Sequence, residues 1–140
     1  MKEIISISVH TALIQNPYGE ILMVKRDEPS LPEVHGTWEL PGGKCNEGES
    51  IEEALPREIM EETGYRVKMG ETLGDPIIKV WEYPEFTQNT FVFCYFAHLI
   101  EDSQAETHDH HVSDIRWVSR ENIDEYPLLP GVLYYIEQLK

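Results

Sequence analysis

The residue pattern predicts an α/β fold in which a mixed β-sheet is covered on both faces by helices. Three observations support this fold class. Strand-like segments lie on both sides of one clear helical segment, a second helical segment ends the chain, and no repeat or low-complexity linker interrupts them. A chain of 140 residues can bury roughly 68–70% of its unfolded surface. We therefore expect one domain, residues 1–140, that needs neither disulfides nor a structural metal.

The N-terminal segment is predicted to contain two strands. In residues 4–14, Ile and Val alternate with Ser and His, which is typical of a half-buried strand. Residues 16–19 (Asn-Pro-Tyr-Gly) form a turn, and residues 20–26 form the returning strand, so we expect a β-hairpin. Residues 27–36 contain Pro29, Pro32 and Gly36 and are predicted to be a loop, and Pro-Gly-Gly at 41–43 is a second break.

From Ser50 onward the apolar period becomes helical. Apolar residues recur at spacings of three and four up to Ile59, and Gly64 supplies a stop. Ser50 followed by Glu53 is the pattern of a capping box. Pro56 lies about six residues into this helix, where it removes a backbone donor. Either a kink just before Arg57 or a helix that begins near Pro56 would accommodate it.

The second half of the chain is predicted to return to strands. The expected segments are 77–83, 90–100 and 114–118, with a polar stretch at 101–111 between the last two. Residues 119–126 and 131–140 are both expected to be helical.

The charge balance excludes several classes of partner. With 11 Lys and Arg against 26 Asp and Glu, the formal net charge is -15, which repels phosphate backbones and anionic lipid surfaces. Duplex nucleic acid and membranes are therefore poor candidates. Two cysteines without zinc spacing favour a reducing compartment, and no apolar run approaches about 18 residues, so we expect a cytoplasmic protein.

The most informative stretch contains seven acids and one Arg within residues 47–62, a net charge of −6. A solvated helix face would be the ordinary interpretation of such a run. At about 100° per residue from Ile51, however, Glu58 falls near 340° and Glu62 near 20°, inside the apolar stripe. Burying two like charges one turn apart is unfavourable unless a cation is present. Mg²⁺ suits this arrangement because it accepts one or two carboxylates and takes further ligands from substrate phosphates.

The same stretch resembles the box that defines the Nudix hydrolase superfamily, which includes the MutT-like proteins. Gly43 opens the box, and it closes at Tyr65, where the pattern usually has an aliphatic residue. Every charged and Gly position of the pattern is matched between them: Gly43, Glu49, Arg57, Glu58, Glu61, Glu62 and Gly64. The Trp-Glu-Leu-Pro-Gly-Gly lead-in at 38–43 and the segment 114–118 also look like this family, so the resemblance covers nearly the whole chain.

The resemblance implies a Nudix-type α/β/α sandwich and hydrolysis of a diphosphate bond in a nucleoside diphosphate linked to another moiety, with Mg²⁺ or Mn²⁺. By the same resemblance Glu58, Glu61 and Glu62 are metal ligands, and the carbonyl of Gly42 also reaches a metal. One of these carboxylates, or a residue outside the box, activates water, Arg57 orients the cluster, and Glu49 braces the loop through Arg57. The predicted catalytic residues are Arg57, Glu58, Glu61 and Glu49.

A general base outside the box is left open. The acids near the last strand are candidates, and His111 stands roughly where some family members have an extra Glu. The acids in question are Glu106, Asp109 and Asp114. His108, His110 and His111 could bind a metal or could simply belong to a solvated loop.

Substrate-binding residues are harder to predict. Arg26 ends a strand close to the 41–43 loop and could contact a phosphate or form a surface ion pair. Tyr83 could stack on a base, as could Trp81 and Phe86, although strand aromatics often belong to the core. The expected substrate is a nucleoside triphosphate or similar small nucleotide. The alternatives are an ADP-ribose or dinucleoside polyphosphate hydrolase, and an idle Nudix-fold module that senses a nucleotide.

Overall fold

The computed structural model describes residues 2–101, 104–107 and 109–139. The elements follow one another along the chain as β1 (Glu3–Leu13), β2 (Ile21–Arg26), β3 (Trp38–Glu39), β4 (Gly42–Gly43), α1 (Ile51–Thr63), β5 (Val67–Thr72), β6 (Ile77–Glu82), β7 (Phe86–Leu99), β8 (Val112–Val118), the 3₁₀ helix η1 (Arg120–Glu125) and α2 (Val132–Glu137). Within the described residues no helix is both long and apolar enough to span a membrane.

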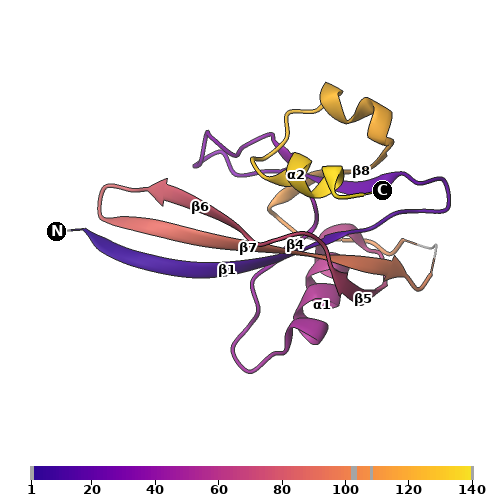
Figure 1. Cartoon of the computed structure of the whole chain (residues 1–140), viewed down its shortest axis with the longest axis horizontal. Helices are drawn as coiled ribbons and strands as arrows, with labels where there is room; N and C mark the ends of the chain where they lie inside the picture. Colours follow the sequence, from indigo (N-terminus) through magenta and orange to yellow (C-terminus); the bar gives the residue numbers. More distant parts are fainter. Residues whose placement is uncertain (1, 102–103, 108, 140) are drawn as a thin grey trace.

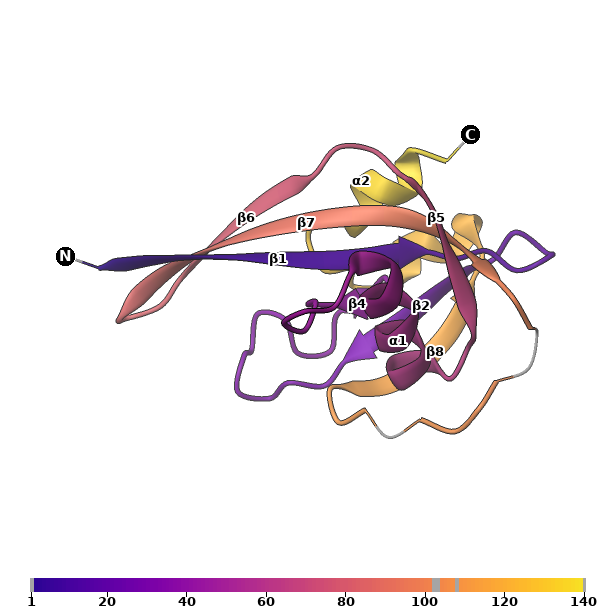
Figure 2. The same cartoon turned by 90° about the horizontal axis from the view of Figure 1, so that it is seen from below.

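The strands of the described residues form two sheets. The larger sheet has the order β4-β1-β7-β5, with β6 also paired to β7, and the smaller has the order β3-β2-β8. The β1–β7 pair is parallel over 11 residues, whereas the other pairs are antiparallel, so the predicted mixed sheet is confirmed. In Figure 2, β1, β6 and β7 extend together as an arm toward the N-terminus.

Helices cover the strands from opposite sides, with α2 above and α1 below them in Figure 1. Successive residues of the central strands alternate between two apolar clusters, as the pleat of a strand requires. Leu13 lies in the cluster that contains Tyr135 of α2, whereas its neighbour Ala12 lies in the cluster that contains Leu55 and Ile59 of α1. The predicted α/β fold with both faces covered is therefore confirmed.

The predicted N-terminal hairpin is wrong, although both strands and the turn are present. Asn16 organises the turn, since its side-chain oxygen accepts hydrogen bonds from the backbone N–H groups of Tyr18 and Glu20. Beyond the single bridge between Gln15 and Ile21, however, the two strands separate into different sheets. Each strand has only two edges, and those of β1 are taken by β4 and β7, while those of β2 are taken by β3 and β8.

The predicted helix is present with the predicted ends. Ser50 is the N-cap and accepts a hydrogen bond from the Glu53 backbone N–H, and Gly64 ends the helix with a positive φ of 77°. The helix begins at Ile51 and contains Pro56, so a helix that begins near Pro56 is excluded. The reciprocal half of the capping box differs from the expected form, because the Glu53 carboxylate accepts from the Ser50 hydroxyl.

Several elements differ from the sequence-based expectation. The strands β3, β4 and β5 were not predicted, because two-residue strands and a Gly-containing segment carry no clear alternation. The later strands are found with shifted ends, and β7 begins at Phe86 rather than at residue 90. The segment expected to be helical at 119–126 is a 3₁₀ helix, and α2 is shorter than residues 131–140.

Candidate active site

The acidic face of α1 turns toward the two-residue strand β4. The Glu62 Oε1 atom accepts a hydrogen bond of 2.8 Å from the Gly42 backbone N–H. Gly43 lies directly against Glu58, because a Cβ atom added to Gly43 would be 2.8 Å from the Glu58 carboxyl carbon. The structure therefore brings Glu58 and Glu62 together with the Gly-Gly backbone, as their position inside the apolar stripe indicated.

Glycine is needed at this close approach for a structural reason. β4 is hydrogen bonded to β1, where Gly42 pairs with Thr11 and Gly43 with His10. A Cβ atom on Gly42 would lie 2.1 Å from the His10 carbonyl oxygen, which no side chain could tolerate. The two glycines thus let the chain pass between β1 and the carboxylates of α1.

Both inward carboxyl groups have altered pKa values. Burial raises the pKa of Glu62 well above its usual range, despite the hydrogen bond from Gly42, and nearby Glu39, Asp109 and Glu58 add to the effect. Burial also raises the pKa of Glu58, which is 20% exposed, although Arg57 lies beside it. In both cases burial outweighs the favourable contacts of the carboxylate, an effect that a nearby cation would oppose.

Arg57 is already engaged by neighbouring acids. Its Nε and one terminal nitrogen donate to the two oxygens of Glu49 at 2.6 and 2.9 Å, a bidentate pair that lowers the pKa of Glu49. Its other terminal nitrogen donates to Glu61 at 2.9 Å, an i,i+4 contact on the same helix. Glu61 is 52% exposed and lies on the Arg57 side of α1.

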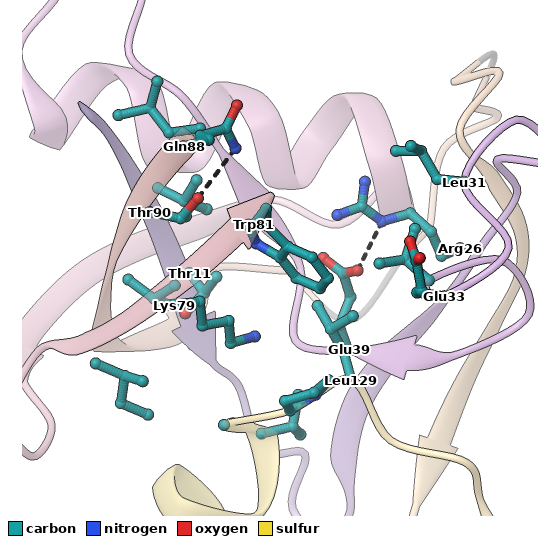
Figure 3. Close-up of a pocket in the computed structure, with 18 of the residues that line it drawn as sticks. Thr11, Arg26, Leu31, Glu33, Glu39, Lys79, Trp81, Gln88, Thr90 and Leu129 are labelled. Carbon is teal, nitrogen blue, oxygen red and sulfur yellow. Dashed lines mark hydrogen bonds and ion pairs between the residues drawn. The ribbon is translucent and has the colours of Figure 1, made fainter. Parts of the chain in front are cut away.

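A cavity of about 330 Å³ adjoins the Gly42-Gly43 segment, because Leu40 and Lys44 on either side of that segment line it. Figure 3 shows it between the strands and the loop before α2, with the indole of Trp81 inside it. Arg26 and Tyr83 both line this cavity, as does Trp81. Arg26 is paired with Glu28, and its Nε donates to Glu39 at 2.8 Å, so the ion pair foreseen as an alternative for Arg26 is present. The ring of Tyr83 stacks on Phe86, with centroids 4.7 Å apart.

Comparison with known proteins decides the family. A family model described as "NUDIX domain" matches residues 7–139. The chain belongs to the Nudix family. It is 36% identical over 107 residues to a Bacillus subtilis "Putative 8-oxo-dGTP diphosphatase", a match that covers 76% of this chain and 62% of that protein's length. It is 29% identical to the Escherichia coli "CTP pyrophosphohydrolase", covering 94% of this chain and 89% of that protein.

Solved structures give the same result. A MutT protein from Methanosarcina mazei is 30% identical with a TM-score of 0.69, covering 99% of this chain and 96% of that chain. A MutT NUDIX hydrolase from Burkholderia pseudomallei is 25% identical with a TM-score of 0.76, covering 96% of this chain and 98% of that chain. The chain is thus a Nudix protein in both sequence and fold.

Nudix proteins generally depend on a divalent metal, and the donor set of this chain fits one. Glu58 and Glu62 are half-buried carboxylates with raised pKa values, and they lie against the half-buried Gly42-Gly43 backbone. Among residues 2–101, 104–107 and 109–139, no group of three or more His, Cys, Asp or Glu side chains could hold a metal ion, so Glu58 and Glu62 would need further ligands from the main chain, water or a substrate. That arrangement suits a hard cation that keeps waters and takes its remaining ligands from a substrate.

Three residues near this Nudix site were not identified from the sequence. Glu39 acts electrostatically on Glu62 and also binds Arg26, so it connects the acidic face to the cavity. Lys79 and Gln88 line the cavity from the neighbouring strands β6 and β7. Glu39 lies in the Trp-Glu-Leu-Pro-Gly-Gly segment at 38–43, so its resemblance to the family could have indicated a role. No local sequence pattern marks Lys79 or Gln88.

The polar loop before β8 also approaches the acidic face. Asp109 raises the pKa of both Glu58 and Glu62 by its charge, and its Oδ1 accepts from the His111 backbone N–H at 2.7 Å. Of the acids considered as a base outside the box, Asp109 is therefore placed near the carboxylates. His108 lies outside the described residues.

Proposed function

We propose that this chain is a Mg²⁺- or Mn²⁺-dependent hydrolase that cleaves a diphosphate bond in a nucleoside triphosphate or a similar small nucleotide. The observation that carries the proposal is the pair Glu58 and Glu62, which lie half buried against Gly42 and Gly43 with pKa values raised by burial. A pair of this kind binds a hard cation, and the adjoining cavity has the size of small-ligand sites. Relatives named as 8-oxo-dGTP diphosphatase and CTP pyrophosphohydrolase support this reaction class.

In this proposal Glu58, Glu61 and Glu62 supply carboxylate ligands, and the Gly42 carbonyl is a further ligand. A bound divalent cation would neutralise phosphate oxygens and the leaving group. Glu58 or Glu61 accepts the proton of the attacking water, because a carboxylate within hydrogen-bond reach of that water can act as the general base. Arg57 acts as a positioning residue, since its fork holds Glu49 on the loop and Glu61 on the helix at the same time.

The cavity would hold the nucleoside part of the substrate. Tyr83 and Trp81 offer aromatic surfaces along one side of it. Arg26 already has two carboxylate partners, so its contribution is to orient Glu39 at the mouth of the cavity rather than to serve as a free phosphate-binding cation.

Substitution of the two carboxylates tests the proposal. In Glu58→Gln and Glu62→Gln, kcat should fall by orders of magnitude with nucleoside triphosphates and Mg²⁺, while circular dichroism shows a folded protein. Glu52→Gln is the matched control, because Glu52 is an exposed acid of the same helix. Unchanged turnover in both variants would refute the mechanism. Tight nucleotide binding without any product across a broad panel would instead identify a sensing module.

A further inference from the structure

One face of three neighbouring strands forms the floor of the cavity. In the register of β6, β7 and β1, Trp81 lies opposite Gln88, and Lys79 lies opposite Thr90, which in turn neighbours Ile7. All five residues line the cavity. The floor therefore carries one basic and two uncharged polar side chains among aromatic and aliphatic ones.

Lys79 is a cation without an assigned partner. Figure 3 shows it on the same strand as Trp81, and both side chains extend into the cavity. Within the described part of the chain, the Lys79 ammonium forms no hydrogen bond or ion pair. Burial lowers its pKa, and the nearby charge of Glu39 only partly opposes this effect. Arg26 has its charge balanced by Glu28 and Glu39, and Lys44 is exposed at the rim. Lys79 is thus the half-buried group that still requires an acceptor.

Lys79 lies on the α2 side of the cavity, with Glu39 between it and the acidic face of α1 in the electrostatic sense, since the Glu39 charge acts on both Lys79 and Glu62. A Cβ atom added to Gly131, at the start of α2, would lie 3.3 Å from the Lys79 Cε atom. α2 and α1 cover opposite sides of the strands, as Figure 1 shows. A nucleotide whose phosphates reach Glu58 and Glu62 would therefore present its base, not its phosphates, to Lys79.

The polar groups of the floor determine which bases fit. An ammonium group has three donors and no acceptor, so it requires an acceptor on the ligand. The Gln88 amide nitrogen donates to the Thr90 hydroxyl at 3.0 Å, which leaves the Gln88 carbonyl oxygen as an acceptor for a ligand amino or ring N–H group. Guanine, cytosine and uracil carry exocyclic carbonyl oxygens, whereas the exocyclic group of adenine is an amino donor.

We infer that Lys79 determines base specificity by donating a hydrogen bond to an exocyclic carbonyl oxygen, so that the site selects oxo-bases over adenine. The inference rests on the proposed function for the placement of the phosphates. In the same pose adenine would place its amino donor where the other bases place the carbonyl oxygen, so that Lys79 could be satisfied only by a ring nitrogen of a displaced base. Because a hydrogen bond to a charged group is lost, we expect discrimination of about 10- to 100-fold.

The test measures binding separately from turnover. The dissociation constants of GMP, CMP and AMP are determined by isothermal titration calorimetry for the wild type, for Lys79→Met and for Lys68→Met. Lys68 is an exposed residue of β5 and serves as the matched control. We expect the wild type and Lys68→Met to bind GMP and CMP at least about tenfold more tightly than AMP, and Lys79→Met to lose most of this preference.

Several outcomes would overturn the inference. Equal binding of AMP and GMP by the wild type would do so even if Lys79→Met failed to fold, as would absence of binding of all three nucleotides. An equal loss for all three in Lys79→Met would show that Lys79 contacts the shared phosphate or ribose.

Turnover separates this inference from the proposed function. With GTP, CTP and ATP, Lys79→Met should raise KM for GTP and CTP while kcat changes little. A wild-type protein that prefers GMP and CMP but hydrolyses no nucleotide would refute the proposed function and support the role of Lys79. Hydrolysis of all three triphosphates with equal kcat/KM would support the proposed function and refute the role of Lys79 in base specificity.

Discussion

Replacing Gly43 by Ala should displace the Glu58 carboxylate without disturbing the backbone. Gly43 and Gly70 are the two glycines of the chain outside the left-handed region, so alanine is compatible with the conformation at both positions. At Gly43 the new methyl group would meet the Glu58 carboxyl carbon at 2.8 Å and its Oε2 atom at 2.9 Å. Both close contacts belong to the end of one side chain, which can move.

The size of the effect follows from this distance. Ordinary contacts of a Cβ atom begin near 3.4 Å, so the carboxylate has to retreat by about 0.6 Å, the difference between 3.4 and 2.8 Å. A misplacement of about 1 Å at a reacting centre can reduce the rate about 100-fold. We therefore expect kcat of Gly43→Ala to fall by about tenfold, with a higher Mg²⁺ concentration required for half-maximal activity.

The assay is steady-state hydrolysis of a nucleoside triphosphate across a Mg²⁺ titration. Gly70→Ala, in β5, is the matched control, because its methyl group would lie equally close, 2.8 Å, to the His98 ring nitrogen of β7, with the Phe96 carbonyl oxygen at 3.0 Å. Gly70→Ala should leave kcat and the Mg²⁺ requirement unchanged, whatever its effect on stability. If Gly43→Ala retains wild-type kcat and Mg²⁺ dependence, the close approach of Gly43 to Glu58 has no part in catalysis.

Three further substitutions test the site and the core. Arg57→Lys should lower kcat about 10- to 100-fold in a folded protein, because a lysine cannot bind Glu49 and Glu61 together as the Arg57 fork does, and equal turnover would contradict this. The pKa of Glu62 is higher in the native metal-free protein than in the unfolded chain, so the native protein keeps a proton that the unfolded chain releases. The free energy of unfolding therefore falls as pH rises from the unfolded-state pKa to the native-state pKa of Glu62. Thermal unfolding should therefore show that Glu62→Gln raises Tm at about pH 8 and flattens the pH profile, whereas a lower Tm would oppose the assigned shift. Ile59→Ala, at a fully buried position, should reduce the free energy of unfolding in urea by about 2–5 kcal/mol, and a change below about 1 kcal/mol would show that Ile59 is not a core residue.

The acidic helix shows how far local sequence information reaches. Its cap at Ser50, its end at Gly64 and the inward direction of Glu58 and Glu62 all followed from spacing within about fifteen residues. Pro56 did not break the helix as one alternative required. The contact of Arg57 with Glu49 was also anticipated, from the resemblance to the Nudix box.

The N-terminal strands show where this reach ends. Alternation identified residues 4–14 as a strand, and the turn after it indicated a second strand, but neither signal shows which edge each strand offers to which partner. β1 pairs with β7, some eighty residues further along the chain, and a local hairpin was therefore the wrong expectation. The short strands β3 and β4 exist because their neighbours hold them, and two residues carry no period of their own.

By itself the sequence determined the acidic helix, its two ends, the face that carries Glu58 and Glu62, and the family. Helix geometry and caps depend on residues only a few positions apart. Only the tertiary structure decided how that helix meets the rest of the chain. It placed Gly43 against Glu58, Glu39 between the acidic face and the cavity, and Lys79 in the cavity floor. These placements arise from packing between segments distant in sequence, and the free energy of that packing belongs to the whole fold rather than to any one segment.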